Sequence, residues 1–186
     1  HDRTTETLGL LYDMHWPFRQ VETAREVRRT PFHDRVAAAG ACFGELAGWE
    51  RANWYAPPGV LPRYEYSYGR QNWFEYSAEE HRAVREGVGI FDQTAFGRIL
   101  VTGRDAEAVL SRICSANVAV EPGRIVYTQW LNERGGIEAD LTVTRTSERE
   151  FMVITAAATV RRDLDWLRRH NPDDAHCFAF EVSNAY

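Results

Sequence analysis

Two β-patterned runs on either side of the Gly135–Gly136 pair constrain the fold of this chain more than any other feature. Residues 127–144 read YTQWLNERGGIEADLTVT, with apolar and polar positions alternating in the second run. Successive side chains of a strand point to opposite faces, so the pattern predicts two strands joined by a turn. In the second run the apolar positions are Ile137, Ala139, Leu141 and Val143, and the polar positions are Glu138, Asp140, Thr142 and Thr144.

Asp140 is the unusual member of this pattern. Aspartate is disfavoured in strands because its short side chain competes for nearby backbone hydrogen bonds and adds little to a packed face. On the polar face it either points to bulk water or lines a polar cleft. The spacing alone favours bulk water, because most charged side chains of folded proteins are exposed.

The region after residue 76 has the regular pattern of a folded domain. Ser77 and Glu80 are spaced as a capping box, which predicts that a helix begins there. The order strand-helix-strand-strand-strand-helix-strand predicts an α+β fold, with an antiparallel or mixed sheet and its helices on one face. The expected helices cover residues 77–86, 105–114 and 159–170, and the expected strands cover residues 99–102, 125–131, 137–146, 151–155 and 176–182.

Residues 1–76 form an irregular, aromatic-rich segment that several prolines interrupt. A short helix over 31–39 and extended runs over 41–45 and 49–56 are expected within it. Its tryptophans could form a cage around a cofactor or act as buried anchors, and packing is the favoured interpretation because large aromatics dominate cores. We place a domain boundary between residues 76 and 77.

Composition excludes several classes of function. All 22 basic residues are arginine, so chemistry through a lysine imine is excluded within this chain. The net charge of -5 argues against a nucleic-acid partner, which would require a basic face. No apolar run approaches the roughly 20 residues that a membrane-spanning helix needs.

Cysteine and histidine spacing indicates neither a disulfide framework nor a metal site. Cys42, Cys114 and Cys177 are odd in number and far apart, which is typical of reduced thiols in a cytoplasmic protein. No two histidines have the i, i+4 spacing of a helical zinc site. We therefore expect a cytoplasmic location and no bound metal.

Long ordered motifs resemble one enzyme family. The order Tyr-x-x-x-Leu-Asn-Glu-x-Gly-Gly-Ile-x-x-Asp-Leu at 127–141 resembles the signature of folate-binding aminomethyltransferases, the T-protein of the glycine cleavage system and its relatives. Residues 79–110 are similar to the opening of that domain, and residues 14–56 resemble the middle region of sarcosine and dimethylglycine dehydrogenases. The resemblance implies a ferredoxin-like subdomain, with residues 77–186 as the N-terminal part of a truncated folate-binding domain.

The same resemblance implies a site. Asp140 matches the family carboxylate that lies against the reduced folate, where it serves as general acid/base and electrostatic stabiliser. Two positions depart from the family pattern: Thr155 stands where an asparagine is expected, and Ala139 replaces the first residue of an Asp-Asp pair. The other folate-binding positions that the resemblance implies are Tyr127, Thr142, Thr144, Val153, Thr155, Phe96 and Leu100.

The implied cofactors are tetrahydrofolate and, in a longer parent protein, FAD. Gly87–Asp92 lacks the third glycine of a dinucleotide fingerprint and follows an expected helix rather than a strand, so we expect the flavin domain to lie upstream in the same polypeptide. Because the chain begins at His1 without a methionine, we expect an internal piece that is inactive alone. An N-methyl amine is the expected small-molecule substrate.

Three hypotheses about function follow. The first is a folate-dependent one-carbon transfer module of a sarcosine- or dimethylglycine-dehydrogenase-like flavoprotein, which residues 14–56 favour. The second is a glycine-cleavage aminomethyltransferase that uses a lipoyl carrier protein and no flavin. The third is a non-catalytic folate-binding or assembly module, which Thr155 and Ala139 leave open.

Overall fold

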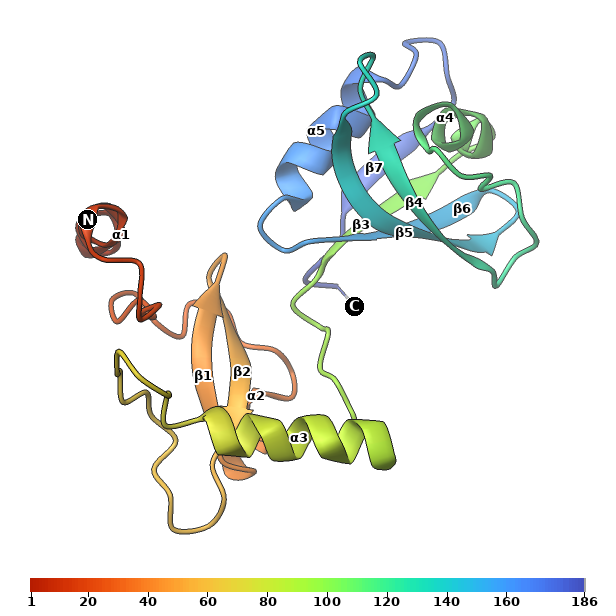
Figure 1. Cartoon of the computed structure of the whole chain (residues 1–186). Coiled ribbons are helices and arrows are strands. Elements are labelled where there is room, and N and C mark those ends of the chain that lie inside the picture. The colour runs from red at the N-terminus through yellow and green to blue at the C-terminus, as the bar shows by residue number, and fades with distance from the viewer. Residues whose placement is uncertain (186) are drawn as a thin grey trace. The chain divides into compact units, whose positions relative to one another are not determined.

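The computed structural model describes residues 1–185, which divide into two compact units. The first unit is His1–Ala95, and the second begins at Phe96 (Figure 1). The domain boundary expected between residues 76 and 77 stays a prediction. The geometric division lies later in the chain because helix α3 (Phe74–Glu86) packs within the first unit.

The first unit is built on an antiparallel pair of strands. Strand β1 pairs with β2 from Ala41↔Tyr55 to Leu46↔Trp49, as the extended runs in the sequence predicted. Its small core contains Cys42 and Trp54, and the Trp54 ring stacks on Tyr76 of α3 at a centroid distance of 5.5 Å. The elements of this unit are α1 (Asp2–Tyr12), α2 (His33–Ala38), β1 (Ala41–Leu46), β2 (Trp49–Tyr55) and α3 (Phe74–Glu86). The sequence did not predict α1.

Helix α3 begins earlier than the capping-box pattern predicted. Its N-cap is Trp73, and no side chain caps it, so Ser77 lies inside the helix. The Oε1 atom of Glu80 instead accepts a hydrogen bond from the backbone N of Tyr55 at 2.9 Å. The predicted capping box is therefore wrong: Glu80 ties the helix to β2, and the stacking of Tyr76 on Trp54 holds the residues before Ser77 in the helix.

The second unit is an antiparallel five-stranded sheet with the strand order β4-β5-β6-β3-β7. Without the edge strand β4, the order is that of a ferredoxin-like sheet. The predicted α+β fold with helices on one face is confirmed, because both helices contribute to a single core under the sheet (Figure 1). The elements are β3 (Gly97–Thr102), α4 (Ala106–Ile113), β4 (Ile125–Leu131), β5 (Ile137–Ser147), β6 (Glu150–Thr155), α5 (Val160–Arg169) and β7 (Phe178–Glu181).

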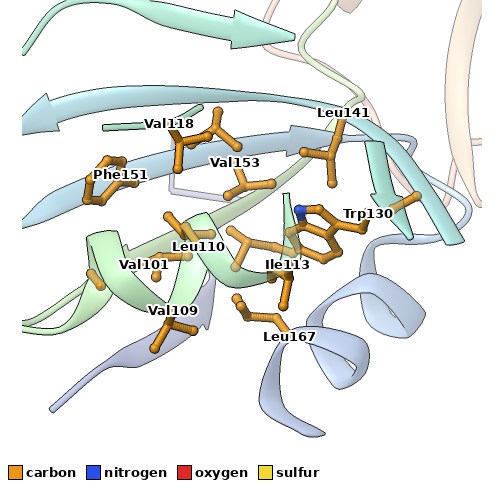
Figure 2. Packing of buried hydrophobic residues seen from close by; sticks show 14 of the residues in the cluster. Val101, Val109, Leu110, Ile113, Val118, Trp130, Leu141, Phe151, Val153 and Leu167 are labelled. Carbon is orange, nitrogen blue, oxygen red and sulfur yellow. The ribbon is translucent and has the colours of Figure 1, made fainter. Parts of the chain in front are cut away.

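The core of the second unit lies between the sheet and its two helices. Figure 2 shows Leu110 of α4 and Leu167 of α5 on the same side of the sheet as Val153 and Trp130. These four side chains are at most 1% exposed. Burial of one sheet face against two amphipathic helices is the main stabilising contribution in such a layer, because apolar area is removed from water.

The three cysteines are free thiols, as their spacing predicted. Burial raises the pKa of both the Cys42 and the Cys114 thiol to about 11. A thiol with such a pKa is almost entirely protonated at neutral pH and is a poor nucleophile. Both cysteines therefore belong to the packing of the protein rather than to its chemistry.

Candidate functional site

The pairing register places Asp140 on the sheet face that the helices leave open. Gln129 of β4 pairs with Asp140 of β5, and Tyr127 pairs with Thr142. The alternate residues of β5 point into the core, with Ala139 at 5% exposure. Thr144, two residues beyond Thr142, shares the open face. The alternation in the sequence therefore assigned the two faces of residues 139–144 correctly, whereas Ile137, expected on the apolar face, is 67% exposed.

Asp140 and Tyr127 lie on neighbouring strands. They are diagonal neighbours in the β4–β5 register, and the Asp140 side chain is exposed. A hydrogen bond to the Asp140 carboxylate is the main cause that raises the pKa of the Tyr127 phenol above its ordinary value. Loss of the phenol proton would place a second negative charge beside the carboxylate, which explains the direction. The two groups are polar neighbours on the open face.

The two best-formed concavities of the described residues do not include this pair. They have volumes of about 450 and 230 Å³ and lie elsewhere. The first is in the second unit, between the end of β3, the β5–β6 turn at Arg149 and the residues around His176. The second is in the first unit, between the end of β2 and α3. Neither concavity includes Asp140, whose side chain is exposed on the open sheet face.

Apolar side chains continue the open face beside the polar strand. Ile154 of β6 pairs with Thr142, Met152 pairs with Thr144, and Leu100 of β3 pairs with Met152. Phe180 of β7 pairs with Leu100 and is 51% exposed. Leu100 thus lies on the face of Asp140, as the resemblance implies. Sequence reasoning missed Met152, Ile154 and Phe180.

Phe96 comes directly before β3 and is 38% exposed. Its backbone O accepts a hydrogen bond from Nη1 of Arg98 at 3.1 Å. It is the first residue of the second unit, and no described contact joins it to Asp140. A folate contact at Phe96 stays a prediction.

Val153 and Thr155 lie on the opposite face of the sheet from Asp140. Val153 is fully buried in the core, and Thr155 is 3% exposed. The Thr155 hydroxyl donates to Oδ2 of Asp163 on α5 at 2.5 Å. The structure therefore does not bring these two predicted folate contacts together with the carboxylate. Residues 151–155 read FMVIT, which is apolar on both faces, so alternation could not reveal which face is the core.

Among the described residues, no group of three or more His, Cys, Asp or Glu side chains could hold a metal ion. Within residues 1–185 no helix combines the length and the apolar character needed to cross a membrane. The polar side chains on the open face around Asp140 include Tyr127, Gln129 and the two threonines of β5.

Two known protein families match the chain. The model of the GCVT N-terminal domain family matches residues 32–186, and that of the FAD dependent oxidoreductase central domain matches residues 1–30. The chain belongs to the GCVT N-terminal domain family.

Relatives of the chain include an oxidase and a dehydrogenase. It is 52% identical, over 90% of its length, to 4-methylaminobutanoate oxidase (formaldehyde-forming) of Paenarthrobacter nicotinovorans, of which it covers 20%. It is 33% identical, over 77% of its length, to mitochondrial sarcosine dehydrogenase of Homo sapiens, of which it covers 18%. The chain therefore spans about a fifth of the length of these relatives.

The fold agrees with this family. The crystal structure of the glycine cleavage system aminomethyltransferase T from Bartonella henselae superposes with a TM-score of 0.63 at 26% identity. The match covers 85% of this chain and 39% of that protein. The chain is thus an aminomethyltransferase-like domain related to N-methyl amine dehydrogenases, as its motifs predicted.

Proposed function

We propose that the chain is the part of a one-carbon transfer enzyme that binds tetrahydrofolate on the open face of the second unit. In this proposal Asp140 is the catalytic residue. The observation that carries it is the position of Asp140 beside Tyr127 on the uncovered face of a sheet whose family includes aminomethyltransferases. A charged strand residue on an otherwise half-apolar face needs a polar ligand or solvent as its partner.

A carboxylate at this place would serve the transfer of a methylene unit. Tetrahydrofolate, when bound, would supply two amine nitrogens that replace the amine on the methylene carbon of the iminium, and the amine would leave carrying the protons of those nitrogens. Asp140 would accept a proton from an attacking nitrogen and pass it to the departing amine nitrogen. An ionised Asp140 also stabilises the positive charge of the iminium and of the first adduct.

The residues of the open face fit a reduced folate. A pterin ring has hydrogen-bonding edges and flat apolar faces, so it requires polar and apolar groups side by side. Thr142 and Thr144 of β5 offer hydroxyls, and Leu100, Met152 and Ile154 offer the apolar surface next to them. Tyr127 completes the polar end of this surface.

For the whole protein we propose an FAD-dependent dehydrogenase of an N-methyl amine of the sarcosine or dimethylglycine type. The match of residues 1–30 to an FAD dependent oxidoreductase central domain supports this over a glycine-cleavage aminomethyltransferase. FAD would supply the oxidation and would bind outside the residues described here. Folate capture would compete with hydrolysis of the iminium, which yields formaldehyde, the product that the name of the oxidase relative gives.

The test compares Asp140→Asn with the wild type in the protein at the full length that its gene encodes. Removal of a general base lowers the rate of the catalysed step by roughly 10²- to 10⁴-fold. The rate of methylene-tetrahydrofolate formation is therefore expected to fall by that factor, while the yield of formaldehyde rises. Flavin reduction by the amine, followed by absorbance, is expected to stay unchanged.

The matched control is Glu148→Gln, which removes a carboxylate from the exposed β5–β6 turn, away from Asp140. It is expected to leave the product ratio unchanged. Equal yields of methylene-tetrahydrofolate from Asp140→Asn and the wild type would overturn the catalytic role. A wild-type protein that binds no tetrahydrofolate would overturn the function itself and leave a non-catalytic assembly module.

A further inference from the structure

The half of β5 that carries Asp140 has a strand partner on one side only. Strand β4 pairs with β5 from Leu131↔Ile137 to Ile125↔Thr144. Strand β6 begins its pairing with β5 only at Thr142↔Ile154, because β6 ends at Thr155. The backbone groups of 137–141 that point away from β4 therefore have no partner in β6, and those that are buried need another partner, since unpaired buried peptide groups are costly.

Arg162 supplies such a partner. It lies in the first turn of α5, and its Nη2 donates a hydrogen bond to the backbone O of Glu138, two residues before Asp140. A guanidinium presents several donors in a rigid planar fork, so it can hold a backbone carbonyl and a carboxylate together. The helix thus holds β5 where β6 does not reach.

The guanidinium of Arg162 is itself held by a buried carboxylate. Its Nε and Nη2 lie 3.3 and 3.2 Å from Oδ1 of Asp163, whose side chain is 1% exposed. The other oxygen, Oδ2, accepts hydrogen bonds from the hydroxyls of Thr155 at 2.5 Å and Thr159 at 2.7 Å. A carboxylate with this many partners in a low-dielectric interior has a single favoured orientation.

The side chain of Glu138 is held as well. Its Oε1 accepts a hydrogen bond from Nδ2 of Asn132 at 2.8 Å, and Asn132 organises the β4–β5 turn by binding the backbone N of Gly136. The backbone before Asp140 is therefore fixed by Arg162 on one side and by the turn on the other. The backbone after it is fixed by the Thr142↔Ile154 pair.

We propose that Arg162, held by Asp163, is a positioning residue that sets the place of Asp140 on the open face. This inference rests on the proposed function, because it concerns the same carboxylate. It also assigns a role to Thr155, which departs from the asparagine of the family pattern: Thr155 orients Asp163 from the end of β6. In this proposal Arg162 acts through the backbone of Glu138.

The first experiment measures hydrogen–deuterium exchange without folate. Arg162→Ala is expected to speed exchange of the amides in 137–141 by roughly tenfold, because one charge-assisted hydrogen bond that holds this segment is lost. Exchange in the core strand β3 is expected to stay the same. The control is Arg161→Ala, which removes a neighbouring exposed arginine with no described side-chain contact; unchanged exchange in Arg162→Ala would overturn the proposal.

The second experiment measures folate coupling in the full-length protein. Arg162→Ala is expected to lower the rate of methylene-tetrahydrofolate formation by roughly tenfold or more, since small displacements of a catalytic group are costly. Flavin reduction is expected to stay unchanged. Arg162→Lys keeps a charged donor and is expected to recover part of the loss, whereas Arg161→Ala is expected to behave like the wild type.

A double variant separates positioning from a general loss of structure. If Arg162 acts only through Asp140, then Asp140→Asn combined with Arg162→Ala couples folate no worse than Asp140→Asn alone. If the fold-losses in folate coupling of the two single variants multiply in the double variant, the positioning role is overturned. Wild-type folate coupling in Arg162→Ala would overturn it too. A wild-type protein without folate binding would overturn the proposed function and this role with it. If Asp140→Asn lowers folate coupling and Arg162→Ala does not, only the role of Arg162 is overturned.

Discussion

The two faces of the five-stranded sheet differ in what covers them. One face packs against α4 and α5, and its central residues Val153 and Phe151 are fully buried. The other face carries Asp140 and Tyr127, with Tyr127 62% exposed. The same strands build both faces, because side chains alternate. Stability therefore depends on the residues of the covered face, and the proposed chemistry depends on the alternating residues of the open face. Substitutions at adjacent positions of one strand therefore separate the two roles.

The largest expected effect is on the covered face. Phe151→Ala leaves a cavity in the core and is expected to lower the free energy of unfolding by about 3–5 kcal/mol. Its neighbour Met152 lies on the open face, so Met152→Ala is expected to cost only about 1 kcal/mol or less. Urea unfolding of both variants measures the difference. Equal losses would contradict the distinction between the faces.

The next effect concerns the buried carboxylate of α5. Asp163→Ala leaves the hydroxyls of Thr155 and Thr159 without their acceptor and is expected to destabilise the fold by about 1–3 kcal/mol. Asp165 on the same helix forms an exposed pair with Arg169 at 2.9 Å. Asp165→Ala is expected to change stability by less than about 1 kcal/mol. Thermal unfolding compares the two, and a cost for Asp165→Ala as large as that for Asp163→Ala would count against the network.

A smaller effect on stability is expected on the open face. Tyr127→Phe removes only a hydroxyl that is exposed, so stability is expected to stay within about 0.5 kcal/mol of the wild type. Binding of tetrahydrofolate, measured by titration calorimetry, is expected to weaken because the phenol no longer pairs with Asp140. If Tyr127→Phe lowered the free energy of unfolding by several kcal/mol, Tyr127 would belong to the core and the comparison of the two faces would fail.

The smallest effect is a shift in one titration. The hydrogen bond to Asp140 raises the pKa of Tyr127 above the ordinary 10.0, so the phenol stays protonated to a higher pH than a free tyrosine. Asp140→Asn removes the negative charge and is expected to lower that pKa toward 10.0. Ultraviolet titration of phenolate formation, compared with Tyr127→Phe to identify the signal, measures it. An unchanged pKa in Asp140→Asn would show that the two groups do not interact.

Much of the second unit could be predicted because its signals are local. The glycine pair and the alternation around it gave the β4–β5 hairpin, and the amphipathic pattern gave α5. The start of α3 could not be predicted, because contacts with β2 extend it past the capping residues. The face of Val153 and Thr155 could not be predicted either, because β6 is apolar on both sides.

By itself the sequence determined the α+β order of elements and the face on which Asp140 lies, because the two-residue period of a strand is a property of the local backbone. Only the tertiary structure decided that Thr155 binds Asp163 and that Arg162 reaches the carbonyl of Glu138. These contacts join α5 to strands distant in the sequence. They depend on where β6 ends and how the helix packs over the sheet, which no local pattern specifies.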